Sequence, residues 1–291
     1  MKHGIRADTQ AQGPIASPGL LGDTTTRDYS RKLKLFNSFA EPELRRAIAS
    51  LCLKLGTSIL DAGCGAGQAL NWLLDAVDSE GLVVGLDLAA AHTAIARLNA
   101  LSQTIVVQGD LLKAPFACAS FDLVWSVNAV NHLRDPLVGV QKLASLLRPG
   151  GRIALGQSSL LPDMYFAWDS RLERMTNEAV RQYYRERYGL SERDLTEIRS
   201  VVGLLHRAKL HNVTVQTFMI ERVSPVGPAD EAYLLEVIFR DTWGERLRPY
   251  LSREDFDELA RLCDPRHPQF ALRRPDFHFL QSFTLATGAI L

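Results

Sequence analysis

The stretch I-L-D-A-G-C-G-A-G-Q, residues 59–68, decides the fold. It indicates an apolar strand that ends at Asp61, a glycine-rich loop and the start of a helix. Glycines such as Gly63, Gly65 and Gly67 allow a tight strand-to-helix turn, let a ligand approach the backbone closely and accept positive φ. The N-terminus of the following helix offers free N–H groups to a carboxylate. The stretch therefore predicts a ligand site at the end of a buried strand.

The spacing of the glycines indicates the ligand. A dinucleotide site has the pattern G-x-G-x-x-G. Here the third glycine comes one residue early, and Gln68 stands where the last glycine of that pattern would be, which argues against a nucleotide-dependent dehydrogenase. Asp61 would also repel a pyrophosphate, but it suits a cationic amino group. S-adenosylmethionine (SAM) carries both an ammonium and a carboxylate, so an acid followed by glycine amides matches it.

Short apolar strands alternate with amphipathic helices through the first half of the chain. The expected strands are 58–62, 82–88, 104–107, 121–127 and 152–157. Two helices are expected to bury apolar positions at helical spacing: Leu70, Leu73, Leu74 and Val77 in the first, and Ala91, Ala94, Ile95 and Leu98 in the second. Asp135 and Pro136 are expected as the N-cap and first residue of a later helix. The alternation predicts an α/β fold with a parallel sheet covered on both faces.

The remaining segments divide the chain into expected parts. Residues 1–26 lack periodicity and predict a disordered tail. Residues 27–56 are expected to form N-terminal cap helices, with a short helix over 28–40 and a second one that Pro42 opens. The SAM-binding core is expected at 57–160, a helical lid insertion at 161–195, and completion of the sheet over 196–291 with a helical insertion at 225–275. In that insertion, Ser252 and Asp255 form a capping-box pattern.

The segment D-A-G-C-G-A-G, residues 61–67, closely resembles the first motif of the class I SAM-dependent methyltransferases, in the small-molecule branch that is ubiquinone/menaquinone-methyltransferase-like. Residues 121–133 and 147–153 resemble later motifs of the same family, so the resemblance spans roughly residues 55–157. It implies a Rossmann-like sheet of strand order 3-2-1-4-5-7-6, with strand seven antiparallel and helical lid insertions. The last two strands are expected at 213–223 and 276–290.

The resemblance also implies cofactor contacts beyond the glycine loop. Asp87 ends the second strand where an acid binds the ribose hydroxyls, with Leu88 beside the adenine. The alternative for Asp87 is a helix N-cap. Asp110 and Leu111 are expected to contact the adenine, and a loop-capping role is the alternative for Asp110. Asn128 would lie beside the methionine moiety.

Methyl transfer is an in-line displacement that depends chiefly on positioning, and a base is needed only if the acceptor must lose a proton. His132, just after the fourth strand, is the candidate base, and a structural histidine is the alternative. Tyr29 would either fold over SAM or pack within the N-terminal helices. The full predicted cofactor set is Asp61, Gly63, Cys64, Gly65, Gly67, Gln68, Asp87, Leu88, Asp110, Leu111, Asn128 and Tyr29.

Aromatic side chains of the 161–195 insertion are the candidate substrate contacts: Tyr165, Trp168, Tyr183 and Tyr184. An insertion at this position would overhang the methyl group. The alternative is core packing, since Trp168, Met175 and Ala179 belong to a stripe at helical spacing. We expect methylation, with oxygen favoured, of a small apolar or aromatic metabolite in small-molecule biosynthesis or secondary metabolism. The alternatives are a SAM-binding enzyme of another reaction class, such as a cyclase or decarboxylase, and a non-catalytic interaction module.

The composition indicates which classes of partner and which cellular location are expected. The formal net charge is +0 and no long Lys/Arg run occurs, so no nucleic-acid partner is expected. The four cysteines form no C-x-x-C pair, and we expect a reduced, cytoplasmic protein. Neither a signal peptide nor a membrane-spanning run is expected. No acidic triad has metal-ligand spacing, so metal independence is expected, and a homodimer is left open.

Overall fold

The computed structural model describes residues 30–159, 165–166, 169–189, 191 and 200–291. The predicted tail over 1–26 and the predicted site residues Tyr29 and Trp168 lie outside these ranges. Tyr165 is described only as part of a short strand, and its side chain also lies outside them. Within the described ranges, no helix combines the length and the apolar character needed to cross a membrane.

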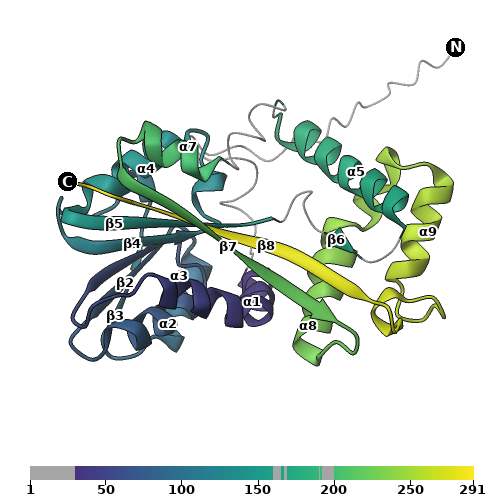
Figure 1. The fold of residues 1–291 in the computed structure, drawn as a ribbon, viewed down its shortest axis with the longest axis horizontal. Coiled ribbons are helices and arrows are strands. Elements are labelled where there is room, and N and C mark those ends of the chain that lie inside the picture. The colour runs from purple at the N-terminus through teal and green to yellow at the C-terminus, as the bar shows by residue number, and fades with distance from the viewer. Residues whose placement is uncertain (1–29, 160–164, 167–168, 190, 192–199) are drawn as a thin grey trace, which may run out of the picture.

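One mixed sheet organises the chain (Figure 1). Its parallel part has the order β3-β2-β1-β4-β5. The strands are β1 (Ser58–Ala62), β2 (Leu82–Asp87), β3 (Thr104–Gln108), β4 (Phe121–Val127) and β5 (Leu147–Ser158). β8 (His278–Ala289) pairs antiparallel with β5, and β7 (His211–Val223) pairs antiparallel with the other edge of β8. Since β6 (Tyr165–Phe166) is only a two-residue addition to β8, the long strands confirm the predicted order 3-2-1-4-5-7-6, with the last one antiparallel.

Helices cover both faces of the sheet, and the core is accordingly in two layers. The first layer packs α1 (Ser30–Ser50), α2 (Gln68–Val77) and α3 (Ala90–Asn99) against one face. The second packs α4 (Pro136–Ser145) and α7 (Val201–Arg207) against the other. Ile59 and Leu60 are neighbours on β1, yet they lie in opposite layers and are both fully buried. This is the pattern expected of a parallel sheet without a solvent-facing side.

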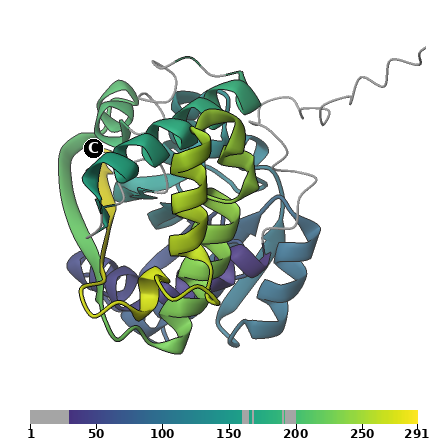
Figure 2. The same cartoon turned by 90° about the vertical axis from the view of Figure 1, so that its right-hand side faces the viewer.

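The second half of the chain adds a group of helices, here called the helical module. It comprises α5 (Ser170–Tyr188), α8 (Pro228–Tyr233), the π-helix η3 (Leu234–Thr242), the 3₁₀ helices η4 (Glu245–Tyr250) and η5 (Ala271–Arg273), and α9 (Arg253–Cys263). The module lies beyond the carboxyl ends of β4 and β5, on the long extension of β7 and β8 (Figures 1 and 2). One hydrophobic cluster runs from α1 into the module and joins the two. Because ligands bind at the carboxyl ends of the strands in open α/β folds, the module faces the edge of the sheet where a ligand is expected.

The prediction that Pro42 opens a helix was wrong, because α1 runs unbroken through it. A proline inside a helix cannot donate to the carbonyl one turn back and usually breaks the helix. Here Arg222 of β7 donates from Nη2 to the carbonyl oxygen of Phe39, within one turn of Pro42. The same guanidinium lies 4.7 Å from the Phe39 ring and forms ion pairs with Glu43 at 3.2 Å and Asp230 at 2.9 Å. These tertiary contacts stabilise the proline-containing turn.

Three other local predictions are confirmed. The buried face of α2 is as predicted, with Leu70, Leu73, Leu74 and Val77 in the core. Asp135 caps α4 by accepting from the Val138 amide at 3.1 Å, with Pro136 as the first helical residue. Ser252 likewise caps α9 through the Asp255 amide.

The predicted face of α3 was wrong. Its buried residues are His92, Thr93 and Ala96, whereas Leu98 is 86% exposed. The helix is rotated so that a histidine, and not an apolar residue, faces the end of β2. Met175 of α5 is also exposed rather than part of a buried stripe.

Candidate functional site

The glycine loop is held against the end of β2 by its own amides. The amides of Gly63 and Cys64 both donate to the Leu86 carbonyl, at 2.7 and 3.0 Å. The Gly65 amide donates to Oδ2 of Asp87 at 2.9 Å. The loop therefore folds over the carboxyl ends of β1 and β2, and Asp87 fixes its central turn.

Two of the glycines are required by conformation and by space. Gly63 has φ +85°, and a Cβ there would lie 2.4 Å from the Cβ of Ala129 in the loop after β4. Gly65 has φ +54°, and its Cβ would lie 2.9 Å from Cδ1 of Leu33 in α1. Positive φ is unfavourable for residues with a side chain. The loop is thus a bare-backbone cradle between α1 and the loop after β4.

Asp61 is a buried acid without a neutralising partner in the part of the chain that the structure describes. It is the penultimate residue of β1, its side chain is only 3% exposed, and Oδ2 has no hydrogen-bond partner among the described residues. Burial, reinforced by the nearby charge of Asp87, raises the pKa of Asp61 to about 8. An isolated buried carboxylate is unstable unless it gains a donor or a cation. The ammonium of SAM is both, so this site fits the predicted cofactor.

Asp87 ends β2 and uses both carboxylate oxygens within the protein. Oδ2 accepts from Gly65, and Oδ1 accepts from the Ala89 amide at 2.9 Å and lies 3.2 Å from Nδ1 of His92. An ionised carboxylate has about four acceptor positions, so capacity remains for ribose hydroxyls. Sequence reasoning missed His92, because a histidine inside an apolar helix face gave no signal of its own.

The predicted adenine contacts lie beside the end of β3. Leu88 is 37% exposed although it is apolar, which leaves its side chain accessible to an aromatic ring. Asp110 caps the short helix η1 (Leu111–Lys113), since Oδ1 accepts from the Leu112 amide at 2.9 Å. The capping alternative for Asp110 is therefore observed, and it uses one of the two oxygens. Leu111 follows directly and is partly buried.

The end of β4 carries Asn128 in a left-handed conformation, with φ +51°. Its Oδ1 accepts from the amide and the hydroxyl of Ser158, at 2.9 and 3.1 Å. The side chain thus ties β4 to the end of β5. His132 lies on the surface at the end of η2 (Val130–His132).

Two further side-chain oxygens are buried at this edge of the sheet. Oδ1 of Asn131 and Oε1 of Gln157 have no hydrogen-bond partner in the part of the chain that the structure describes. With Asp61, unsatisfied acceptors therefore occur at or just beyond the ends of β1, β4 and β5. Unpaired buried polar groups of this kind are unusual in a folded protein and need an explanation, which a bound ligand with donor groups supplies.

The first turns of α1 lie over the glycine loop. Leu33 is the neighbour of Gly65, and Nδ2 of Asn37 donates to Oε1 of Gln68 at 3.1 Å. Arg31 forms a short ion pair with Glu236 of η3, 2.5 Å between Nη2 and Oε1. α1 therefore contacts both the glycine loop and the helical module.

The predicted substrate tyrosines lie together on α5. The rings of Tyr183 and Tyr184 have centroids 5.3 Å apart, and Tyr250 of η4 lies 6.3 Å from Tyr183. The guanidinium of Arg246 lies 4.8 Å from the Tyr183 ring centroid and 5.7 Å from that of Tyr184. Sequence reasoning missed Arg246, one arginine among many in this half of the chain.

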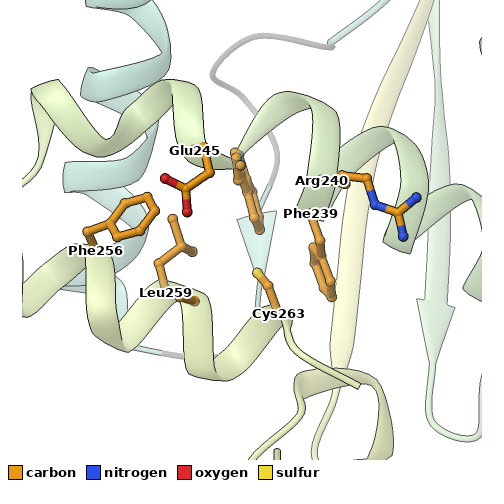
Figure 3. A pocket seen from close by; sticks show the side chains of 9 residues that line it. Phe239, Arg240, Glu245, Phe256, Leu259 and Cys263 are labelled. Atoms are coloured by element: carbon orange, nitrogen blue, oxygen red, sulfur yellow. The ribbon is translucent and has the colours of Figure 1, made fainter. Parts of the chain in front are cut away.

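A separate cavity of about 340 Å³ opens among η3, η4 and α9 (Figure 3). Glu245, Phe256 and Leu259 lie around it, and Arg240 points away from it. Burial raises the pKa of the Cys263 thiol in its wall. None of the predicted cofactor or substrate residues lines this cavity. Among the described residues, no group of three His, Cys, Asp or Glu side chains could hold a metal ion.

Comparison with known proteins gives one family. Residues 60–155 match the family described as a methyltransferase domain. The malonyl-[acyl-carrier protein] O-methyltransferase of Pseudescherichia vulneris is 30% identical over 243 residues, which cover 74% of this chain and 93% of that enzyme. The 27-O-demethylrifamycin SV methyltransferase of Amycolatopsis mediterranei (strain S699) is 31% identical over 122 residues, which cover 40% of this chain and 44% of that enzyme.

The fold comparison agrees with the sequence comparison. The YcgJ protein of Bacillus subtilis matches with a TM-score of 0.52 at 17% identity, over 88% of this chain and 98% of that one. Together with the sheet order and the match over 93% of the P. vulneris enzyme, this identifies a methyltransferase of small molecules with SAM as its cofactor. The chain belongs to the class I SAM-dependent methyltransferases.

Proposed function

We propose that the chain transfers the methyl group of SAM to an oxygen atom of a small, apolar or aromatic metabolite. Both curated relatives described above carry names that place the methyl group on oxygen. The tyrosines Tyr183 and Tyr184, joined by Tyr250, offer aromatic surface in the helical module. Aromatic side chains favour planar, apolar ligands.

The observation that carries the proposal is the buried, unpaired carboxylate of Asp61 beside a bare glycine loop. In our proposal Asp61 binds the ammonium of SAM, and the loop amides and the first turn of α2 face its carboxylate. Asp87 binds the two ribose hydroxyls with its remaining acceptor positions. Leu88, Asp110 and Leu111 surround the adenine.

The chain's own contribution to the reaction is mainly positioning. Bound SAM supplies a methyl group on a sulfonium, which is intrinsically electrophilic. Holding the acceptor oxygen in line with that methyl group lowers the barrier by roughly 7–11 kcal/mol in favourable cases. His132 takes the proton from a neutral hydroxyl acceptor, whereas an acceptor that is already a carboxylate needs no base.

The test uses SAM labelled in its methyl group, the purified chain and an extract of the cells that produce it. We expect the label to enter a small organic compound. Mild alkali identifies a methyl ester, because it cleaves the ester, whereas ethers and N-methyl or C-methyl groups survive it. For a product that survives, the carbon-13 chemical shift of the transferred methyl group distinguishes oxygen from nitrogen and carbon. Label on nitrogen or carbon would refute O-methylation, and absence of transfer with SAM bound would favour another reaction on the same fold.

The remaining expectations about partners belong to this proposal. We propose that the enzyme acts without nucleic acid and without a metal ion. A homodimer stays a hypothesis that sedimentation of the purified chain would test.

A further inference from the structure

Arg246 of η4 is a cation without a carboxylate partner in the described chain. Its Nε donates to the Thr242 carbonyl at 3.2 Å, and Nη2 is buried with no hydrogen-bond partner among the residues that the structure describes. Nearby arginines of the module behave differently: Arg248 pairs with Glu245 at 2.8 Å, and Arg171 pairs with Asp255. A buried guanidinium N–H without an acceptor costs free energy, so this side chain needs a further explanation.

The acid next to Arg246 in the chain, Glu245, and the acid that contacts Tyr250 of the same helix, Glu186, are both already engaged. Glu186 of α5 accepts from the hydroxyl of Tyr250 at 2.7 Å and from Gln182 at 3.1 Å. Glu245 accepts two hydrogen bonds from Arg248, at 2.8 and 3.0 Å. Within the described ranges, Arg246 therefore keeps a positive charge without an ion pair, in a partly buried position.

Aromatic rings fix the orientation of this charge. Tyr183 and Tyr184 lie at 4.8 and 5.7 Å from the guanidinium carbon, and their own planes are nearly perpendicular, at 88°. Cation–π contacts hold a guanidinium without neutralising it. An arginine held in this way keeps its planar fork of donors, which matches the oxygens of a carboxylate or phosphate bidentately.

A second unsatisfied polar group lies on the same helix. Thr176 of α5 is 1% exposed, and its hydroxyl has no hydrogen-bond partner among the described residues. It lies seven residues before Tyr183, and positions seven apart lie on the same face of an α-helix, about 10 Å apart along its axis. The inner face of α5 therefore carries a free hydroxyl, two tyrosines and their arginine neighbour.

We propose that Arg246, framed by Tyr183 and Tyr184, binds an anionic group of the methyl acceptor, either a carboxylate or a phosphate. This inference rests on the proposed function, and it narrows the substrate to an acceptor that carries a negative charge. The module that holds Arg246 faces the carboxyl ends of β4 and β5 (Figure 1). Anchoring one end of the acceptor at this position leaves its other end to be oriented toward the cofactor edge.

Calorimetry on the full chain saturated with S-adenosylhomocysteine tests the proposal with three matched probes: benzoate, phenyl phosphate and neutral benzamide. We expect benzoate or phenyl phosphate to bind and benzamide to bind at least tenfold more weakly. The stronger of the two anions identifies the acceptor's charged group. Arg246→Gln should lower the affinity for that anion by about tenfold to a hundredfold, the range for a charged hydrogen bond.

Two further variants control for folding and for general charge. Arg246→Lys keeps the charge without the bidentate fork and should recover part of the anion affinity. Arg248→Gln removes a cation two residues away that is already paired and lies 4.1 Å from the Phe256 ring; it should change nothing. Equal binding of benzamide and benzoate, no anion binding at all, or an equal loss in Arg248→Gln would overturn the proposal. Failure of S-adenosylhomocysteine to bind the wild-type chain would instead refute the proposed function.

Discussion

Replacing Asp61 by asparagine tests whether a buried carboxylate recognises the cationic end of the cofactor. Burial, together with the charge of Asp87, raises the pKa of Asp61 from its ordinary value of 3.8 to about 8. The cofactor-free protein therefore holds Asp61 protonated at neutral pH. An ammonium bound beside it favours the charged form, so binding must expel a proton.

The sign and size of the effect follow from the shifted pKa. The folded state binds this proton more tightly than the unfolded state, so the stability it contributes is complete below about pH 4 and is lost as pH rises to about 8. Four pKa units at about 1.4 kcal/mol each set an upper limit of about 6 kcal/mol for that loss. At pH 7 a group with a pKa near 8 is roughly nine-tenths protonated, so cofactor binding should release close to one proton.

The assay is titration calorimetry with S-adenosylhomocysteine in buffers of different ionisation enthalpy. For the wild-type chain we expect release of about 0.9 proton at pH 7 and an affinity that rises up to tenfold per pH unit between about pH 5.5 and 7. Asp61→Asn should release no proton on binding, and its affinity for S-adenosylhomocysteine should not depend on pH in this range. Above pH 7 the cofactor-free variant should be more stable to unfolding than the cofactor-free wild-type chain. Asp87, His92 and Cys64 remain in the variant, so the two proteins differ in this site only at position 61.

A matched control is Asp122→Asn, at the opposite end of the neighbouring strand, where the acid is paired with Arg148 at 2.9 Å. It should leave both proton release and cofactor affinity unchanged. The reasoning is refuted if the wild-type chain binds without releasing a proton at pH 7. It is equally refuted if Asp61→Asn keeps the pH dependence of the wild type.

Four further results are expected. Asp87→Ala should weaken S-adenosylhomocysteine binding at least tenfold in calorimetry, because it removes the ribose acceptor and the anchor of the Gly65 amide; unchanged affinity would exclude the ribose assignment. Gly65→Ala and Gly150→Ala both place a side chain at positive φ and should each cost about 1 kcal/mol in urea unfolding. Only Gly65→Ala should also lose cofactor affinity, since a Cβ at Gly150 meets open space. Arg222→Met should lower the free energy of unfolding by about 3 kcal/mol, because the buried Glu43 then keeps only the exposed Arg46, at 3.3 Å, as its ion partner. Arg45→Met, with both acid partners exposed, should cost under about 1 kcal/mol. EDTA should leave methyl transfer intact, and strict dependence on added magnesium would contradict this.

The parts of the fold that sequence predicted are those set by local chemistry. The strand 58–62 and the glycine turn after it are encoded within ten or so residues, and the structure has both where the sequence predicts them. The caps at Asp135 and Ser252 are equally local. The sheet order came from resemblance to a family, because strand pairing across more than 100 residues leaves no local pattern.

The wrong predictions involve partners that are distant in sequence. Pro42 suggests a helix boundary when only its missing N–H is considered. The group that stabilises the unbroken helix is Arg222, 183 residues away from the carbonyl it contacts. The face of α3 was misjudged for a related reason: hydrophobic spacing gives no weight to His92, whose position is set by Asp87 on a neighbouring strand.

In the candidate site, too, the residues that sequence could indicate differ from those that depend on tertiary structure. Tyr183 and Tyr184 were selected because aromatic residues cluster in the insertion, and composition is visible in sequence. Arg246 could not be selected, because whether an arginine has an acid partner is decided by tertiary structure. The absence of that partner in the described chain, and not the arginine itself, is the informative feature.

In our proposal the cofactor and the acceptor are bound by parts of the site that differ in charge, although the chain as a whole is neutral. The edge of the sheet carries the acids Asp61, Asp87 and Asp110, which suit a cationic, hydroxyl-rich cofactor. The helical module carries the uncompensated cation Arg246, which repels that cofactor and suits an anionic acceptor. In this proposal the two ligands bind at different parts of the site, and neither competes for the other's position. An acceptor anchored through its anionic group keeps its reactive oxygen free to turn toward the sheet. Positioning of this kind accounts for most of the rate enhancement that an in-line methyl transfer requires from the protein.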